Sequence, residues 1–315
     1  MRQSNLNIRT DLIVGFRAVP PRTSLLTASD NWELSVTSPE FDDDAIRQFK
    51  EVGHLRIKIG SALEDMIQGV YPAAAEFFQL DIETKRKDAL PFDAGYRPFG
   101  IEYSDSPNRP DLMESFSTSY FSHDAQKTLQ TRQGKHLYKS MHALHNKLEI
   151  LTENFVIKLA DTIGGPHTGE KFRNALHQWS ILQINHNINI EDTRSQYIND
   201  PHEDACLVTL ISNTGPGLEF RMPDGTFSPI NISDDELLLV PGEILWLLTG
   251  GVIQPLYHRV VRTESSLRRK ALLFFADPDP ELCTPWIASD VNRGIDIGDR
   301  IRRNPLLIGL RERGA

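Results

Sequence analysis

Residues 202–217 read HEDACLVTLISNTGPG and decide how the rest of the chain is interpreted. The stretch opens with a His-x-Asp pair, continues as a short run of β-forming apolar residues and ends in a Gly- and Pro-rich turn. Side chains alternate along extended chain, so we expect His202 and Asp204 on one face and Glu203 on the other. The pattern therefore predicts that one strand supplies two metal ligands.

A third ligand is expected from His258, which follows after enough chain for several strands and turns. Two imidazoles and one carboxylate can hold a divalent iron on one face and leave the opposite face for substrate and oxygen. A zinc hydrolase could use the same ligands, because catalytic zinc also takes three protein groups and a water. One chance His-x-Asp in a chain with ten histidines is about an even bet, so the surrounding pattern has to decide.

Several short strand-like segments surround these residues. They are separated by Asp-Gly, Pro-Gly and Gly-Gly turns and lie at 205–211, 218–220, 227, 236–240, 244–248 and 271–275. Many short strands with regular turn signals indicate a sandwich or barrel. The double-sheet jelly roll, which can hold a metal between its sheets, is the natural candidate.

Helical patterns dominate before residue 178. We expect amphipathic helices at 42–52 and 62–80, the second interrupted or restarted by Pro72, with a strand at 55–59 between them. The longest candidate, residues 138–163, carries an apolar stripe that should back the sheet. The predicted class is α+β, with a double-stranded β-helix (jelly-roll, cupin-like) core flanked by N-terminal helices.

Four regions of one integrated fold are expected from these patterns. Residues 1–40 form an N-terminal arm, residues 41–177 a mainly helical N-terminal region, and residues 178–280 the jelly-roll core. Residues 281–315 form a C-terminal segment that either lids the barrel mouth or packs on the outside.

Composition bounds the partners and the compartment. A net charge of −9 and a pI near 5.6 argue against nucleic acid or an anionic membrane as the main partner. The longest apolar stretch, 237–248, is broken by Pro and Gly and is too short to span a bilayer. Two cysteines make no disulfide framework, and the N-terminus lacks a signal-peptide core, so a cytoplasmic protein is predicted. No pattern bears on the oligomeric state.

An ordered set of motifs covers roughly residues 40 to 280. In chain order its segments are 49–60, 77–85, 95–102, 111–116, 183–185, His202-x-Asp204, 240–245, 249–251 and 258–260. Together they resemble the isopenicillin-N-synthase-like Fe(II)/2-oxoglutarate dioxygenases. The ordered set is far more specific than any one member. The resemblance implies that His202, Asp204 and His258 hold the catalytic Fe(II).

The same resemblance implies a place for 2-oxoglutarate. The family binds its C5 carboxylate with an Arg-x-Ser motif, which here reads Arg269-x-Ala271. An arginine offers a carboxylate a bidentate, always charged fork, and strand alternation favours Arg269 over Arg268. Asn185 and Asn187 are further candidate ligands of the co-substrate, and Asn187 stands where the family has a Tyr. A charged strand end that pairs with surface acids is the alternative for Arg269.

The implied activity is Fe(II)- and 2-oxoglutarate-dependent oxidation of a small molecule by O2, in specialised metabolism. Hydroxylation, desaturation or cyclisation would be coupled to decarboxylation of 2-oxoglutarate to succinate. Amino-acid-derived or natural-product acids are the expected substrates. Ala271 and Asn187 keep two alternatives open, an oxidase of isopenicillin-N-synthase type that does not use 2-oxoglutarate and an ethylene-forming enzyme. A non-catalytic jelly-roll binding protein is a remote third.

Three further side chains, Tyr96, Arg97 and Arg194, lie in segments that approach the substrate in this family. We expect a solvated side chain for each. Cys206 shares a strand face with the two ligands and is expected to be a buried, inert thiol.

Overall fold

The computed structural model describes residues 32–34, 41–90, 94–119, 125–173, 175–176, 179–189, 195–267 and 269–303. The expected N-terminal arm lies outside these residues except for β1, Trp32–Leu34. Residues 304–315 of the C-terminal segment also lie outside them.

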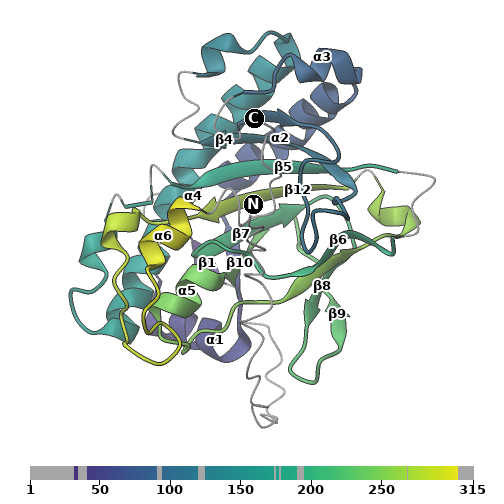
Figure 1. Cartoon of the computed structure of the whole chain (residues 1–315). Coiled ribbons are helices and arrows are strands. Elements are labelled where there is room, and N and C mark those ends of the chain that lie inside the picture. The colour runs from purple at the N-terminus through teal and green to yellow at the C-terminus, as the bar shows by residue number, and fades with distance from the viewer. Residues whose placement is uncertain are drawn as a thin grey trace, which may run out of the picture.

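Two β-sheets form the centre of the molecule (Figure 1). The larger has eight strands in the order β1-β2-β10-β7-β12-β5-β4-β3, and the smaller has four in the order β6-β11-β8-β9. Only the β1–β2 pair is parallel among the pairs of the described strands. The other bounds are β2 (Leu55–Ile59), β3 (Gly95–Arg97), β4 (Met113–Ser119), β5 (Ile181–Asn187), β6 (Tyr197–His202), β7 (Val208–Asn213), β8 (Leu218–Arg221), β9 (Phe227–Pro229), β10 (Glu236–Pro241), β11 (His258–Val261) and β12 (Lys270–Ala276).

Helices cover the outer face of the larger sheet, so the predicted jelly roll with N-terminal helices is confirmed. The α-helices are α1 (Asp43–Val52), α2 (Ser61–Phe78), α3 (Ile82–Arg86), α4 (Arg132–Gly164), α5 (Glu243–Leu248) and α6 (Ile297–Arg302), and short 3-10 segments are Ala125–Thr128, Glu170–Phe172, Glu264–Ser266 and Pro280–Leu282. The long helix α4 contacts β4, β5 and β12, and α2 packs on α4. In Figure 1 the helices α1, α4 and α6 lie to the left and the strands β6, β8 and β9 to the right.

The larger sheet is buried on both faces because alternate side chains serve two cores. On β10, Leu237 and Leu239 join the core beneath the helices, whereas Leu238 and Val240 join a smaller core between the sheets. This period-two division is what a strand between two layers requires. The space between the sheets is where a buried site can form.

Two local predictions differ from the structure. Residues 244–248, which resemble a short strand, belong to helix α5, and Ile244, Leu245, Leu247 and Leu248 are all buried. A short apolar run buried on every side carries no period that separates helix from strand. The helix α2 continues through Pro72 without restarting, at the cost of one backbone hydrogen bond.

The described part of the C-terminal segment packs with the helical layer. Helix α6 contacts α5 and the 3-10 segment Pro280–Leu282, and its Ile297 and Ile301 are buried in the core beneath the helices. Helix α6 therefore extends the helical layer, and a role of the segment as a lid stays a prediction.

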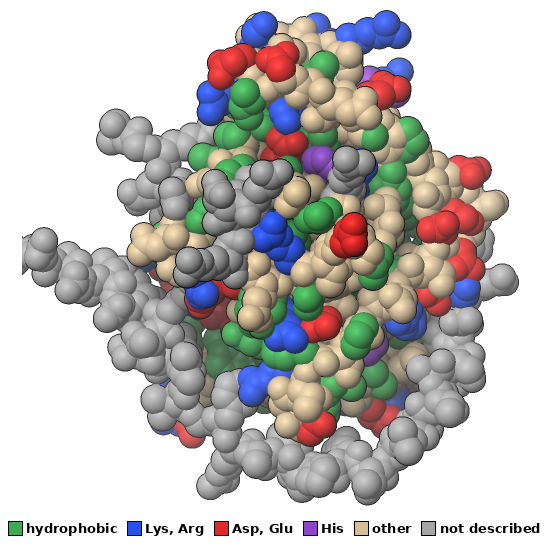
Figure 2. All heavy atoms as spheres, turned by 90° about the vertical axis from the view of Figure 1, so that its right-hand side faces the viewer, with side chains coloured by type: hydrophobic (Ala, Val, Ile, Leu, Met, Phe, Trp, Pro, Cys, Tyr) green, Lys and Arg blue, Asp and Glu red, His purple; other side chains and the backbone are tan. Residues whose placement is uncertain are grey.

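The surface of the described residues is mixed in character. On the face shown in Figure 2, acidic, basic and hydrophobic side chains are interspersed. None of the helices in the described part of the chain is both long enough and apolar enough to cross a membrane.

The helical layer rests on an aromatic cluster that can be tested directly. Phe155 of α4 is fully buried and meets the rings of Phe41 and Phe49 edge-on, at centroid distances of 5.2 and 4.9 Å. We expect Phe155→Ala to lower the free energy of unfolding by about 3–5 kcal/mol in urea titrations, because it leaves a cavity. Ile150→Ala is the matched control, since Ile150 lies on the same helix and is 54% exposed. A loss below about 1 kcal/mol for Phe155→Ala would contradict this account.

Candidate active site

His202 and His258 are brought together by the pairing of β6 with β11. They are the last residue of β6 and the first of β11, and the antiparallel register places them directly opposite each other. Their ring centroids lie 4.3 Å apart. A single cross-strand contact therefore joins two residues that are far apart in the sequence.

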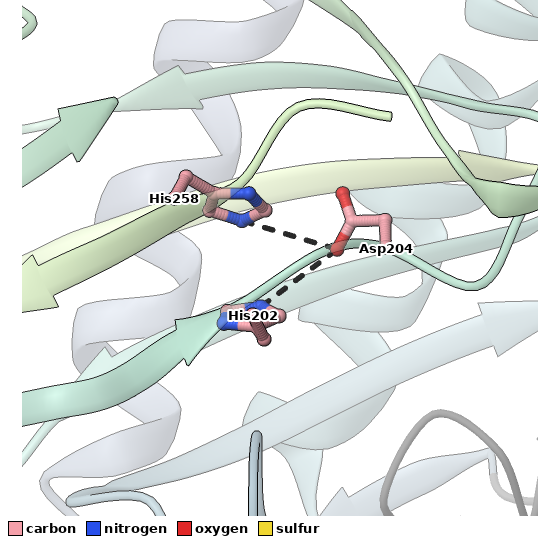
Figure 3. Close-up of side chains that lie close together, drawn as sticks. All are labelled: His202, Asp204 and His258. Atoms are coloured by element: carbon pink, nitrogen blue, oxygen red, sulfur yellow. Dashed lines mark ion pairs between the residues drawn. The ribbon is translucent and has the colours of Figure 1, made fainter. Parts of the chain in front are cut away.

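Asp204 completes the cluster from a turn. The strand β6 ends at His202, so Asp204 lies beyond it, in the loop to β7, contrary to the expectation of one strand with two ligands. Its Oδ1 lies 3.8 Å from Nε2 of His202 and 3.9 Å from Nε2 of His258. Figure 3 shows both imidazoles directed at this carboxylate. The structure thus assembles the three side chains that the sequence singled out.

Backbone carbonyls fix the tautomer of both imidazoles. Nδ1 of His202 lies 2.7 Å from the carbonyl oxygen of Asp200, and Nδ1 of His258 lies 3.0 Å from that of Leu256. A carbonyl oxygen can only accept, so each Nδ1 carries the proton and each Nε2 presents its lone pair to the shared centre. This is the arrangement that metal-binding histidines use.

The carboxylate of Asp204 is also oriented by a hydrogen bond on the side away from the shared centre. Its Oδ2 accepts a hydrogen bond from Oγ1 of Thr209 at 2.6 Å, while Oδ1 faces the imidazoles. The three ligand atoms all lie within 4.8 Å of one another. Two imidazole nitrogens and one carboxylate oxygen, each oriented by an outer hydrogen bond, fit a divalent iron.

The start of helix α5 holds the turn that carries Asp204. The backbone N–H of Glu243 donates to the carbonyl of Asp204 at 2.8 Å, and that of Ile244 donates to the carbonyl of Cys206 at 3.1 Å. A Cβ at Gly242 would lie 2.2 Å from the Cys206 carbonyl oxygen, so only glycine permits this approach. The Pro-Gly-Glu turn seen in the sequence is therefore a support for the ligand turn.

A cavity opens between the two sheets beside this triad. The triad lines one side of it, and the alternate β12 residues Ala271, Leu273 and Phe275, preceded by Arg269, line the other. The expected strand alternation is thereby confirmed for β12. Glu203, which was expected to point away, is exposed and borders the same cavity.

Arg269 is a buried cation with one hydrogen-bond partner among the described residues. It is 4% exposed, and its Nε donates to the carbonyl of Gly215 at 3.1 Å. Its two Nη groups have no hydrogen-bond partner among the described residues. Burial lowers the pKa of Arg269 to about 10, which leaves the guanidinium charged at neutral pH. Because a buried charge without a partner is costly, this fork fits an anionic ligand such as a carboxylate.

The two asparagines of β5 are placed differently. Asn185 lines the cavity directly opposite Ala271 in the β5–β12 register. Asn187 is 1% exposed, is not among the residues that line the cavity, and donates its Nδ2 to the carbonyl of Ser266 at 2.8 Å. Asn187 therefore holds the loop before β12, next to Arg269.

Several polar residues of the cavity wall were missed from the sequence. Gln183 lies two residues before Asn185 on β5, and Glu102 and Asp111 come from the loop between β3 and β4. Alternation along β5 could have identified Gln183, whereas no local pattern marks the loop residues. Burial raises the pKa of Asp111 to about 7, against the opposing effect of hydrogen bonds from Ser104.

Two of the three side chains that were expected to be solvated, Tyr96 and Arg97, are buried. Tyr96 is 0% and Arg97 1% exposed, so that prediction is wrong for both. Arg194 lies outside the described residues. Cys206 is buried as expected, with burial raising the pKa of its thiol well above the usual value.

The hydrogen bond from Thr209 to Asp204 yields a prediction about metal affinity. Thr209→Val keeps the shape of the side chain but removes the donor that orients the carboxylate. We expect the Kd for Fe(II), measured by anaerobic titration, to rise roughly 10- to 100-fold. Thr209→Ser keeps the hydroxyl and should bind Fe(II) within a fewfold of the parent. Equal affinity of the Val variant and the parent would show that Thr209 does not act on the site.

Comparisons with known proteins agree with this geometry. No protein-family model matches the chain. Gibberellin 2-beta-dioxygenase 3 from Arabidopsis thaliana is 23% identical over 258 residues, which cover 78% of this chain and 74% of the relative.

Solved structures share the fold. A full-length Neurospora crassa protein in complex with alpha-KG and thymine matches with a TM-score of 0.68 at 18% identity, over 84% of this chain and 90% of the Neurospora chain. JOX2 in complex with 2OG, Fe and JA matches with a TM-score of 0.62 at 16% identity, over 80% of this chain and 77% of JOX2. The chain is therefore similar in sequence to gibberellin 2-beta-dioxygenases and shares its fold with proteins solved in complex with alpha-KG or 2OG.

Proposed function

We propose that this protein is an Fe(II)- and 2-oxoglutarate-dependent oxygenase that oxidises a small organic molecule. The observation that carries the proposal is one cavity lined by the His202, Asp204 and His258 triad and by Arg269, a buried cation with no ion-pair partner among the described residues. The triad by itself would also suit a zinc hydrolase. A buried cation facing the same cavity calls for an anionic co-substrate, which a hydrolase does not need.

Different residues of the cavity would bind the iron and the co-substrate. His202, Asp204 and His258 would hold the iron through two Nε2 atoms and one carboxylate oxygen. When bound, the iron supplies activation of O2, with 2-oxoglutarate giving up two electrons as it becomes succinate and CO2. Arg269 would bind the distal carboxylate of 2-oxoglutarate, and it fixes the direction in which the co-substrate lies.

The primary substrate is a small molecule, and the cavity wall narrows its chemistry. Glu102 and Asp111 place carboxyl oxygens on this wall. Such groups bind substrates that carry N–H or O–H donors. We therefore propose amino-acid-derived acids, whose ammonium group suits these acceptors, as the first class to screen, followed by natural-product acids. A cytoplasmic location remains part of the proposal.

A second candidate is an oxidase of isopenicillin-N-synthase type. Two observations favour it: Ala271 contributes no hydroxyl beside Arg269, and the amide of Asn187 is engaged by the carbonyl of Ser266. The co-substrate then has fewer donors than a carboxylate can accept. Substrate oxidation in the absence of 2-oxoglutarate would identify this candidate.

The proposal is tested by reconstitution without oxygen. We expect addition of Fe(II) and 2-oxoglutarate to give a weak visible charge-transfer band, and admission of O2 to release succinate, faster with a true substrate. His202→Ala and the Zn(II)-loaded protein are the controls, and both should give neither signal. Absence of band and succinate in protein with demonstrably bound iron would refute the use of 2-oxoglutarate.

Arg269 gives a second, independent prediction. Arg269→Gln should raise the Kd for 2-oxoglutarate roughly 100-fold, because the charged bidentate fork is lost, whereas Fe(II) affinity stays within a fewfold. For Arg269→Lys we expect a Kd for 2-oxoglutarate between those of the parent and Arg269→Gln, since an ammonium keeps the charge but not the bidentate geometry. Lys270→Gln is the matched control, because Lys270 precedes Ala271 on the opposite face of β12. Anaerobic titration of the charge-transfer band measures all four proteins, and equal effects at 269 and 270 would contradict the role of Arg269.

A further inference from the structure

A chain of buried hydrogen bonds runs through the cavity wall and ends at Asn185. It begins at Arg97, which is 1% exposed and whose Nη2 donates to Oγ of Ser117 at 2.6 Å and to Oε1 of Gln183 at 2.9 Å. The Nε2 of Gln183 then donates to Oε2 of Glu102 at 3.0 Å and to Oδ1 of Asn185 at 2.7 Å. Gln183 is thus the junction of the chain.

The charged groups fix the direction of every bond in this chain. A guanidinium has only donors, so the Gln183 atom that faces Arg97 must be its oxygen. A carboxylate only accepts, so the Gln183 atom that faces Glu102 must be its nitrogen. That nitrogen also meets Asn185, which must therefore present Oδ1 to it. The orientation of both amides follows from the chemistry of their charged neighbours alone.

The Nδ2 group of Asn185 is consequently turned away from the wall. Asn185 is 7% exposed and lines the cavity, and its Nδ2 has no hydrogen-bond partner among the described residues. In the strand register Asn185 stands opposite Ala271, two residues along β12 from Arg269. The donor that Ala271 lacks is thus available from the neighbouring strand.

The free-energy cost of burying these hydrogen-bonded groups indicates that they serve the site. Among the described residues, the Nε and Nη1 atoms of Arg97 are buried without a hydrogen-bond partner, and the carboxylate of Glu102 lies 3.5 Å from Nη1. Buried ionic groups of this kind are on average no more stabilising than apolar side chains of the same volume. Buried polar atoms left without a partner are rare and call for a reason beyond stability.

We propose that Arg97, Glu102 and Gln183 form a relay that positions Asn185 so that its Nδ2 donates to 2-oxoglutarate beside Arg269. This inference rests on the proposed function. The three relay residues are positioning residues, because they act on the co-substrate only through the orientation of the Asn185 amide.

The test is Gln183→Glu, which keeps the size of the side chain and the acceptor for Arg97. It places an acceptor where Nε2 was, so the Asn185 amide turns to donate Nδ2 to the new carboxylate and presents Oδ1 to the co-substrate. We expect the Kd for 2-oxoglutarate to rise roughly tenfold or more, both in the anaerobic Fe(II) form and by calorimetry of the Mn(II)-loaded protein. The Kd for the metal alone should be unchanged.

Three matched variants separate positioning from packing. Gln183→Met removes the donor without reversing it and should raise the Kd less than Gln183→Glu does. Gln79→Glu makes the same chemical change at an exposed position and should leave the Kd as in the parent. In an Asn185→Ala background, Gln183→Glu should add no more than about twofold, because the amide through which it acts is gone.

The outcomes are distinguishable. A Kd for 2-oxoglutarate in Gln183→Glu equal to the parent value overturns the relay, and so does an undiminished effect in the Asn185→Ala background. Equal losses in Gln183→Glu and Gln183→Met, with a lowered melting temperature and weaker metal binding, would show a purely structural role and also overturn it. If the parent protein with bound Fe(II) does not bind 2-oxoglutarate, the proposed function itself fails.

Discussion

The site depends on one cross-strand contact, the pairing of β6 with β11 that sets His202 opposite His258. Nothing local in the chain brings these residues together, because β6 and β11 become neighbours only when the smaller sheet has formed. Each ring is then aimed by the carbonyl two residues earlier in its own segment, so the backbone itself selects the tautomer. Asp204 joins them from a turn that the amides at the start of α5 hold in place. Backbone groups thus orient both imidazoles and also hold the turn that carries Asp204.

Two buried arginines show how differently a fold can treat the same charge. Arg97 has a carboxylate within the protein, that of Glu102 at 3.5 Å, and its Nη2 donates to Ser117 and Gln183. Arg269 has only the carbonyl of Gly215 among the described residues. Since an unmatched buried charge costs several kcal/mol, the surroundings of Arg269 favour an added anion, whereas Arg97 is part of the cavity wall. The two arginines are almost equally buried, and they differ in the partners that surround their guanidinium groups.

Much of this arrangement is visible in the sequence, and the exceptions have physical causes. The strand at 55–59 follows from period-two alternation, and the turns and the three ligand residues follow from residue chemistry, which is local, although Asp204 lies in a turn and not on the expected strand. The helical state of 244–248 could not be recognised, because burial on every side removes the polar face that marks a helix. The burial of Arg97 could not be predicted, because it depends on Glu102 and Gln183, which reach Arg97 only through tertiary contacts. Asn187 shows the same limit, since its amide is directed by a loop carbonyl that no motif encodes.

The placement of the ligands on two different sheets constrains the co-substrate. The imidazoles belong to the smaller sheet and Arg269 directly precedes β12 in the larger one, so a molecule that touches both must bridge side chains that project from the two packed sheets. A five-carbon dicarboxylate with a metal-binding keto acid at one end and a carboxylate at the other has this character, whereas a monocarboxylate would leave one side unmet. The helices α2 and α4 stabilise the larger sheet from outside, and the turn carrying Asp204 ties β6 to β7 of the larger sheet. The distance between metal and arginine is therefore set by the packing of the whole fold, and selection for co-substrate length is a property of the sandwich as much as of the residues that line it.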